Sequence, residues 1–363
     1  MAGVRAPQPK VRSRKDGAAI PLDETDKRIL NLLQSSFPLD PEPFHLVAGE
    51  AELETDDLMT RTRRLLDERI IREITPIFDT RALGYESMLV AAKVDAENPH
   101  RAAAIINSHP GVSHNYLRTH EFNLWFTIAT PPDSELGLQG SLEVLRELTG
   151  AESIRQLPTL KLFKINMNLE MEKGTDALAS ASDSSPEREL EMQPYDDTDV
   201  AVIKALQGPM EVCDRPYDAA AAEVGMGCEE LLDHLRGMVD RKLLRRVAAI
   251  LFHRRAGFSA NGMGVWKVPD DQILDVGAKM ASVRGVSHCY QRPTYEDWPY
   301  SVFTMAHGRS KEECDAVLQS IADAHGLHGE DRAILYSSTE FKKVRLHYFT
   351  EDYADWEREH AQV

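Results

Sequence analysis

The feature that most constrains the fold is an internal repeat with a period of about 173 residues. Residues 25–34 (TDKRILNLLQ) align with residues 198–207 (TDVAVIKALQ), with the apolar positions in register. One residue later in phase, residues 111–118 (GVSHNYLR) align with residues 285–292 (GVSHCYQR). A repeat this long predicts two copies of one domain arrangement in a single chain.

The composition changes between the two copies. Residues 172–195 are rich in Ser, Ala, Asp and Glu and show no apolar periodicity, which predicts an acidic, solvated linker. The other expected boundaries are a basic disordered tail over 1–20, helix-turn-helix domains over 21–76 and 196–249, a second type of domain over 77–171 and 250–350, and a C-terminal tail over 351–363.

Hydrophobic periodicity predicts the same element order in both copies. Two amphipathic helices, over residues 23–34 and 57–69 in the first copy, precede a short strand from residue 70, the order of a winged helix-turn-helix. A βαββαβ succession follows, so the expected fold class is α+β, a tandem repeat of winged helix-turn-helix plus ferredoxin-like domains. Its expected elements are 88–94, 99–108, 112–118, 123–129, 136–148 and 154–162 in the first copy, and 264–268, 272–282, 286–292, 300–305, 311–325 and 333–342 in the second.

The net charge argues against nucleic acid as a partner. The chain has 59 Asp and Glu against 42 Lys and Arg, a charge of −17 at pH 7, whereas proteins that depend on phosphate contacts are usually basic. The first copy offers Arg61, Arg63 and Arg64 on its second helix as a phosphate-contacting surface. The equivalent helix of the second copy begins with Glu229 and Glu230, which would repel DNA.

The composition also argues against a disulfide-bonded or zinc-binding protein and against a membrane or secreted protein. The four cysteines, at 213, 228, 289 and 314, match neither a CxxC pair nor a closed zinc site, so we expect reduced thiols and no resident metal. No stretch approaches the roughly 18 apolar residues of a membrane span, and the basic first twenty residues lack the apolar core of a signal peptide. We expect a cytoplasmic protein that does not enter a membrane.

A winged helix followed by a βαββαβ domain resembles the Lrp/AsnC family, bacterial regulators whose second domain dimerises and binds amino acids. The sequence after each wing carries further motifs, rich in His, Arg and aromatic residues: 81–85 (RALGY), 114–118 (HNYLR), 120–127 (HEFNLWFT), 253–258 (HRRAGF), 261–263 (NGM), 286–293 (VSHCYQRP), 298–300 (WPY) and 305–308 (MAHG). These motifs more narrowly resemble the siroheme decarboxylases. The resemblance spans about residues 22–350 and implies that two family subunits are fused here, as in the version of the enzyme from the d1-type haem pathway.

The resemblance implies that siroheme, an iron isobacteriochlorin with eight carboxylates, loses carbon dioxide from two acetate side chains to give 12,18-didecarboxysiroheme. No cofactor is implied beyond this iron tetrapyrrole substrate. Holding so many carboxylates calls for arginines, whose planar fork suits a carboxylate. Protonating the ring and the exocyclic carbon calls for a general acid with a pKa near neutrality, which histidine supplies.

These requirements select candidate site residues. His253 and His288 are expected to form the main catalytic site, with His114 and His120 as second candidates, and His288 is alternatively an axial ligand of the substrate iron. Because Thr80 stands where the second copy has His253, we expect one main site per chain. The expected substrate-binding residues are Arg81, Arg118, Arg254, Arg255, Arg292, Lys342, Tyr116, Tyr290, Asn261, Met263 and Trp298.

Several alternatives stay open at this point. A transcriptional regulator and a haem sensor or carrier without turnover would use many of the same residues. Further homologous subunits and a homodimer of the fused chain also stay open. Residues 261–264 (NGMG) do not join a strand to a helix in a βαβ unit, so they are expected to form a turn or bulge and not a dinucleotide loop.

Overall fold

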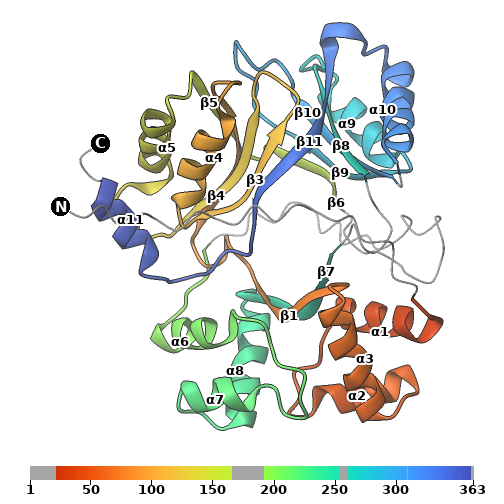
Figure 1. Ribbon diagram of the computed structural model, residues 1–363, viewed down its shortest axis with the longest axis vertical. Helices are drawn as coiled ribbons and strands as arrows, with labels where there is room; N and C mark the ends of the chain where they lie inside the picture. The colour runs from red at the N-terminus through yellow and green to blue at the C-terminus, as the bar shows by residue number, and fades with distance from the viewer. Residues whose placement is uncertain (1–21, 166–191, 253–259, 309, 361–363) are drawn as a thin grey trace.

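The computed structural model describes residues 22–165, 192–252, 260–308 and 310–360. It contains a helical body and, above it in Figure 1, a larger body of strands and helices. None of the helices in these ranges is both long and apolar enough to cross a membrane.

The helical body is built from both copies. Asp23 and Asp26 form a capping box at the start of α1, and Asp196 and Asp199 repeat it at the start of α6, so two backbone N–H groups at the start of each helix are satisfied by side chains. The helices are α1 (Glu24–Ser35), α2 (Pro43–Ala51) and α3 (Thr55–Asp67) in the first copy, and α6 (Asp197–Leu206), α7 (Asp218–Glu223) and α8 (Cys228–Asp240) in the second.

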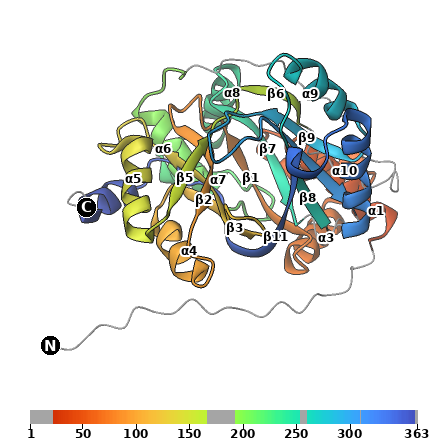
Figure 2. The same cartoon turned by 90° about the horizontal axis from the view of Figure 1, so that it is seen from above.

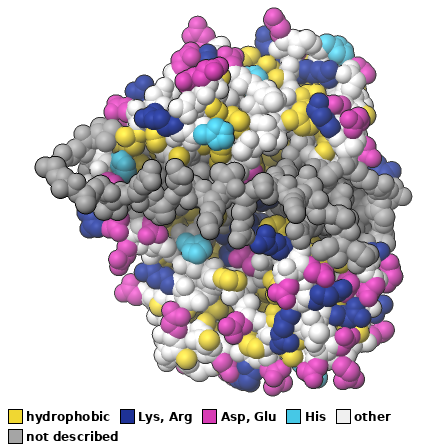
Figure 3. Space-filling view, viewed as in Figure 1, with side chains coloured by type: hydrophobic (Ala, Val, Ile, Leu, Met, Phe, Trp, Pro, Cys, Tyr) yellow, Lys and Arg dark blue, Asp and Glu magenta, His cyan; other side chains and the backbone are white. Residues whose placement is uncertain are grey.

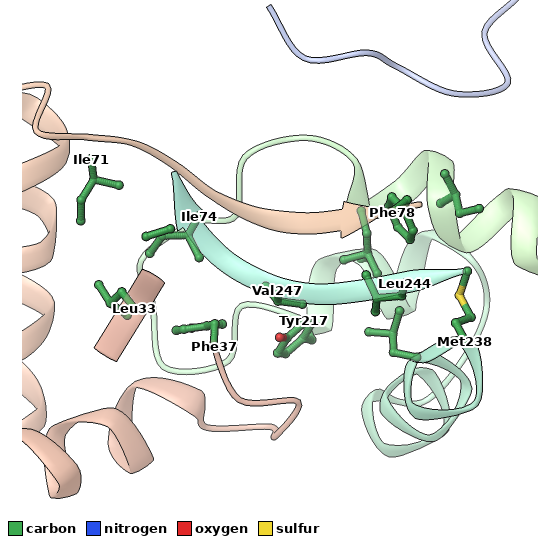
Figure 4. Packing of buried hydrophobic residues seen from close by; sticks show 14 of the residues in the cluster. Leu33, Phe37, Ile71, Ile74, Phe78, Tyr217, Met238, Leu244 and Val247 are labelled. Carbon is green, nitrogen blue, oxygen red and sulfur yellow. The ribbon is translucent and has the colours of Figure 1, made fainter. Parts of the chain in front are cut away.

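The expected wing strands pair with each other. Strand β1 (Ile71–Phe78) runs antiparallel to β7 (Leu244–Leu251), and together they form a separate two-stranded sheet. Figure 4 shows Ile74 and Val247 on this ribbon packing over Phe37 and Tyr217, which come from different copies. The two helix-turn-helix units therefore share one hydrophobic core.

The larger body contains two ferredoxin-like sheets of four strands each, which are hydrogen-bonded into one nine-stranded sheet with β6 at its edge. The strand order is β5-β2-β4-β3 in the first copy and β11-β8-β10-β9 in the second, which confirms the expected fold class. Figure 2 shows helices α4 and α5 on one side of the strands and α9 and α10 on the other. The elements are β2 (Glu86–Lys93), α4 (Pro99–Ser108), β3 (Val112–Arg118), β4 (Leu124–Thr130), α5 (Gly137–Thr149), β5 (Ser153–Leu157), β6 (Lys161–Ile165), β8 (Ala260–Trp266), α9 (Ile273–Ser282), β9 (Val286–Gln291), β10 (Val302–Gly308), α10 (Lys311–His325), the short 3₁₀-helix η1 (Gly329–Asp331) and β11 (Arg332–Lys343).

The last strand of each copy joins the two sheets. The first part of β11 pairs with β8 of its own copy, and its second part pairs with β3 of the other copy. In the first copy β5 pairs with β2, and β6, which follows it, pairs with β9. Buried aromatic side chains, among them Trp125, Trp298 and Phe303, form a core to which both sheets contribute.

Two sequence expectations differ from the structure. Residues 261–264 form neither a turn nor a bulge, because they lie inside β8 and pair one-to-one with β10. Glycine is required at position 264, because a Cβ atom on this residue would come within 2.8 Å of the Leu318 side chain. The segment expected as a C-terminal tail contains helix α11 (Asp352–His360), whose Trp356 is buried against the first copy.

Candidate active site

A cavity of about 670 Å³ lies where the β1–β7 ribbon meets the two sheets. This volume falls within the usual range for small-molecule sites. Strand β3 of the first copy and strands β8, β9 and β10 of the second copy supply much of the lining, and residues 343–346 with Tyr348, at and beyond the end of β11, supply another part. The site is therefore assembled from both copies.

On β3, the motif His-x-Tyr-x-Arg places three side chains on one face, because successive residues of a strand point to opposite faces. His114, Tyr116 and Arg118 all line the cavity. Asn115, between them, is fully buried on the other face, where its Nδ2 donates to the side-chain oxygen of Asn107 at 3.0 Å. The strand thus separates a functional face from a structural one.

Strand β9 repeats this arrangement. His288 and Tyr290 lie on β9, Arg292 directly follows it, and all three line the same cavity. Cys289 is fully buried on the other face, where its Sγ lies 3.5 Å from the carbonyl oxygen of Gly277. The two copies of the motif, whose histidines the sequence analysis ranked as main-site residue and second candidate, therefore face one cavity.

The lining is strongly cationic. Among the described residues that line it there are three histidines and six Lys or Arg side chains, and there is no Asp or Glu. Such a concentration of positive charge favours a ligand with several carboxylates. The cations are Arg72, Arg118, Arg245, Arg292, Lys343 and Arg345, and the histidines are His114, His288 and His307.

Arg118 and Arg292 occupy equivalent environments. Burial lowers the pKa of each guanidinium to about 10, so both remain charged at neutral pH. The guanidinium of Arg118 lies over the Tyr116 ring at 5.9 Å, and that of Arg292 over the Tyr290 ring at 5.0 Å. The Nε atom of each arginine is buried and has no hydrogen-bond partner within the described part of the chain. Each charge is thus incompletely neutralised, a deficit that a carboxylate could fill.

His114 is neutral in this environment. Burial lowers its pKa to about 4, and the nearby charges of Lys343 and Arg72 contribute to the shift. Its Nδ1 lies 3.0 Å from the hydroxyl of Ser113. An anion in the cavity would oppose these effects and raise the pKa of His114.

The remaining predicted site residues divide into three groups. Asn261 and Met263 line the cavity. His253, Arg254 and Arg255 lie outside the described residues. The third group, whose members do not line the cavity, comprises Arg81, His120, Trp298 and Lys342.

The third group has other contacts. The His120 ring packs edge-on against Trp298 at 5.3 Å, and its Nδ1 accepts a hydrogen bond from the Phe122 N–H. Trp298 is fully buried between the sheets. Lys342 donates from Nζ to the carbonyl oxygen of Asn107 at 2.9 Å, and Arg81 is exposed.

Sequence reasoning missed several lining residues. His307 is not among the expected site residues, although it lies two residues beyond Met305 on the same strand and therefore on the same face. Lys343 lines the cavity in place of Lys342. Arg345 follows β11 and donates from Nη2 to the Pro76 carbonyl oxygen at 2.7 Å. The two residues are far apart in the chain, so no local sequence pattern predicts this contact.

Comparisons with known proteins agree with this architecture. Residues 82–164 and 255–342 match the AsnC-like ligand binding domain, and residues 26–72 and 199–245 match the siroheme decarboxylase NirDL-like HTH domain. The chain is 40% identical to a siroheme decarboxylase of Hydrogenobacter thermophilus over 341 residues, which cover 93% of this chain and 98% of the relative.

A single subunit and a solved structure complete the comparison. The siroheme decarboxylase beta subunit of Methanosarcina barkeri is 42% identical over 153 residues, which cover 42% of this chain and 99% of that subunit. The crystal structure of the siroheme decarboxylase NirDL in complex with an iron-uroporphyrin III analogue matches with a TM-score of 0.73 and 34% identity, over 93% of this chain and 99% of that one. The chain therefore belongs to the siroheme decarboxylase family of carboxy-lyases, in a form that carries two copies of the family's domain pair in one polypeptide.

Proposed function

We propose that this chain removes carbon dioxide from two acetate side chains of siroheme, giving 12,18-didecarboxysiroheme, and that it needs no cofactor beyond the iron tetrapyrrole itself. The observation that carries this proposal is a single cavity whose described lining includes two His-x-Tyr-x-Arg motifs, six cationic side chains and no carboxylate. The related NirDL structure contains an iron-uroporphyrin III analogue, a tetrapyrrole like siroheme.

Arginine and lysine side chains hold the substrate carboxylates in this proposal. Arg118 and Arg292 are the best suited, because each is charged, half-buried and without a carboxylate partner among the described residues. A carboxylate entering beside such a guanidinium gains a charge-assisted hydrogen bond at a place where water is partly excluded. Tyr116 and Tyr290 present aromatic rings next to these charges and would contact the macrocycle.

The chemistry is a proton-for-carbon-dioxide exchange. The ring first takes up a proton, and an acetate –CH₂–COO⁻ then loses CO₂ as its C–C bond breaks and the electron pair moves into the protonated ring. The exocyclic carbon next takes up a proton to become a methyl group while the ring gives back the proton that it had gained, so one proton replaces each CO₂. His288 is the proposed main general acid, together with His253, and His114 serves the same function from the other copy. Axial ligation of the substrate iron by His288 is the alternative role for that ring.

DNA recognition is the competing function, and the arginines it would use are already engaged. Arg61 pairs with Asp23, Asp26 and Asp57, and Arg64 also pairs with Asp26. Arg63 donates to the carbonyl oxygen of Val212 at 2.7 Å. On the helical body, Figure 3 shows acidic and basic side chains interspersed with no single basic patch on this face. We infer that the helix-turn-helix units are structural and that DNA is not a partner.

The test is anaerobic incubation of the purified chain with siroheme, followed by mass spectrometry of the extracted tetrapyrrole. Loss of two carbon dioxide units supports the proposal, and comparison with a 12,18-didecarboxysiroheme standard checks the positions. Siroheme that binds with a shifted absorption band but is recovered unchanged would contradict turnover by this chain alone, leaving a carrier or an enzyme that needs a further subunit. Absence of binding would favour a regulator.

A further inference from the structure

Each catalytic histidine candidate on β3 and β9 follows a serine that sits at a β-bulge. In the β3–β4 pairing, Val112 faces Ile128 and His114 faces Thr127, so Ser113 is an extra residue. In the β9–β10 pairing, Val286 faces Ala306 and His288 faces Met305, so Ser287 is the extra residue. A bulge changes the direction of neighbouring side chains, and bulges are common beside active sites.

The bulge brings serine and histidine together. In a regular strand they would point to opposite faces, yet the Ser287 hydroxyl oxygen lies 2.7 Å from His288 Nδ1. The same hydroxyl donates to the carbonyl oxygen of Met305 at 3.2 Å. A serine hydroxyl has one proton, so a hydroxyl that donates to Met305 must accept at its contact with His288. Only 3% of Ser287 is exposed, so water does not readily take over either contact.

The first copy has the same bulge with different partners. The Ser113 hydroxyl oxygen lies 3.0 Å from His114 Nδ1 and 2.7 Å from the hydroxyl of Thr127. Thr127 occupies the position of Met305 in the repeat. Because two hydroxyls can each donate or accept, this arrangement is compatible with a proton on either nitrogen of His114.

We propose that Ser287 is a positioning residue that fixes His288 as the tautomer with its proton on Nδ1, whereas Ser113 leaves the tautomer of His114 undetermined. This deepens, and rests on, the proposed role of His288 as general acid. An imidazolium that gives up its Nε2 proton becomes this Nδ1–H tautomer. Ser287 thus accepts the same hydrogen bond before and after the proton is transferred, and the ring does not have to reorient.

The kinetic test compares Ser287→Ala with Ser287→Thr and with Ser113→Ala as the matched control at the equivalent bulge. Ser287→Ala should lower kcat for siroheme decarboxylation by roughly tenfold, a part of the 10²- to 10⁴-fold that a general acid supplies, while KM changes less than twofold. Ser287→Thr keeps the hydroxyl and should restore most of the rate. Ser113→Ala should lower kcat by less than about threefold, since Thr127 still contacts the ring.

The tautomer can be read directly, without turnover. In ¹⁵N-histidine-labelled wild-type protein at alkaline pH, the resonances absent from a His288→Gln variant should show a protonated Nδ1 and an unprotonated Nε2. A protonated Nε2 in the wild type would overturn the proposal, as would equal kcat values for Ser287→Ala and the wild type. If the alanine variant does not fold, the wild-type spectrum still decides. If the wild type shows the Nδ1–H tautomer but does not decarboxylate siroheme, the proposed function fails and the tautomer assignment stands.

Discussion

Arg118 donates a hydrogen bond of 2.9 Å from Nη1 to the carbonyl oxygen of Leu335, which lies on the last strand of the opposite copy. Arg292 makes the equivalent contact with the carbonyl oxygen of Leu157. The repeat therefore gives each copy an arginine that reaches across the junction of the sheets and borders the shared cavity. The same side chain can join the copies and present positive charge to a ligand.

This dual role makes a specific prediction for lysine substitutions. Arg118→Lys and Arg292→Lys keep the charge but lose the planar fork, so each should weaken siroheme binding by about 1.5 kcal/mol, roughly tenfold in Kd. The measurement is an absorption titration with siroheme under anaerobic conditions. Arg81→Lys is the control, because Arg81 is exposed and does not line the cavity. An equal loss of affinity in all three variants would contradict the assignment.

The histidines should separate into two classes. His288→Ala should lower kcat by about 10²- to 10⁴-fold with siroheme binding largely retained, and His114→Ala should lower it by a smaller factor. His120→Ala should keep turnover, because the His120 ring packs on Trp298 and does not line the cavity. Its expected cost is in stability, visible as a lower midpoint of chemical unfolding. Loss of turnover in His120→Ala with a normal unfolding midpoint would show that His120 takes part in the reaction and would contradict its structural assignment.

How much of this site could be predicted depends on the range of the interactions. Alternation along β3 and β9 is local, and it correctly puts His, Tyr and Arg on one face. That both motifs face one cavity depends on strand pairing between the copies, β3 with β11 and β6 with β9, which no local pattern encodes. For a similar reason the cavity is lined by Lys343 and not by Lys342, the residue that the sequence predicted. The β3–β11 register shifts between Glu340 and Lys342, and such an irregularity changes which side chain faces the ligand.

The helices show the same limit. Helix α1 was predictable because its apolar residues recur with helical spacing behind an aspartate cap. Helix α11 carries only a few apolar residues on a charged segment, so its amphipathic signal is weak. It is held by long-range contacts instead. The Glu357 carboxylate accepts hydrogen bonds from the Ser134 hydroxyl and the backbone N–H of Glu135, about 220 residues earlier in the chain.

Protein stability without ligand should fall as the pH drops below the unfolded pKa of histidine. His109 is buried, and burial lowers its pKa from 6.5 to about 3, with Lys342 adding to the shift. Below pH 6.5 the His109 side chain therefore binds a proton in the unfolded state but not in the folded state. The free energy of unfolding decreases as the pH falls through this region. Between pH 7.5 and 5.5 this single group should cost about 1 kcal/mol of unfolding free energy.

Urea unfolding at these two pH values checks this expectation. His114, whose pKa is lowered to about 4, contributes a change of the same sign when the experiment is done without added siroheme. A His109→Gln variant should be less stable at both pH values, because Nδ1 accepts the Gly111 N–H at 3.0 Å and the ring packs on Trp356 at 4.4 Å. It should also lose about 1 kcal/mol of the pH dependence. A pH dependence equal to that of the wild type would contradict the role of His109.

Helix α11 should contribute substantially to stability although none of its residues lines the cavity. Trp356 is 5% exposed and contacts the hydrophobic core of the first copy, so Trp356→Ala should lower the unfolding free energy by about 3 kcal/mol. Glu359→Ala, an exposed change on the same helix, should lower it by less than about 0.5 kcal/mol. Both variants should bind siroheme with the affinity of the wild type at a temperature where they are folded, because neither residue lines the cavity. A loss of affinity in Trp356→Ala alone would show instead that α11 supports the cavity through α4 and β3, against which the first copy's core is packed.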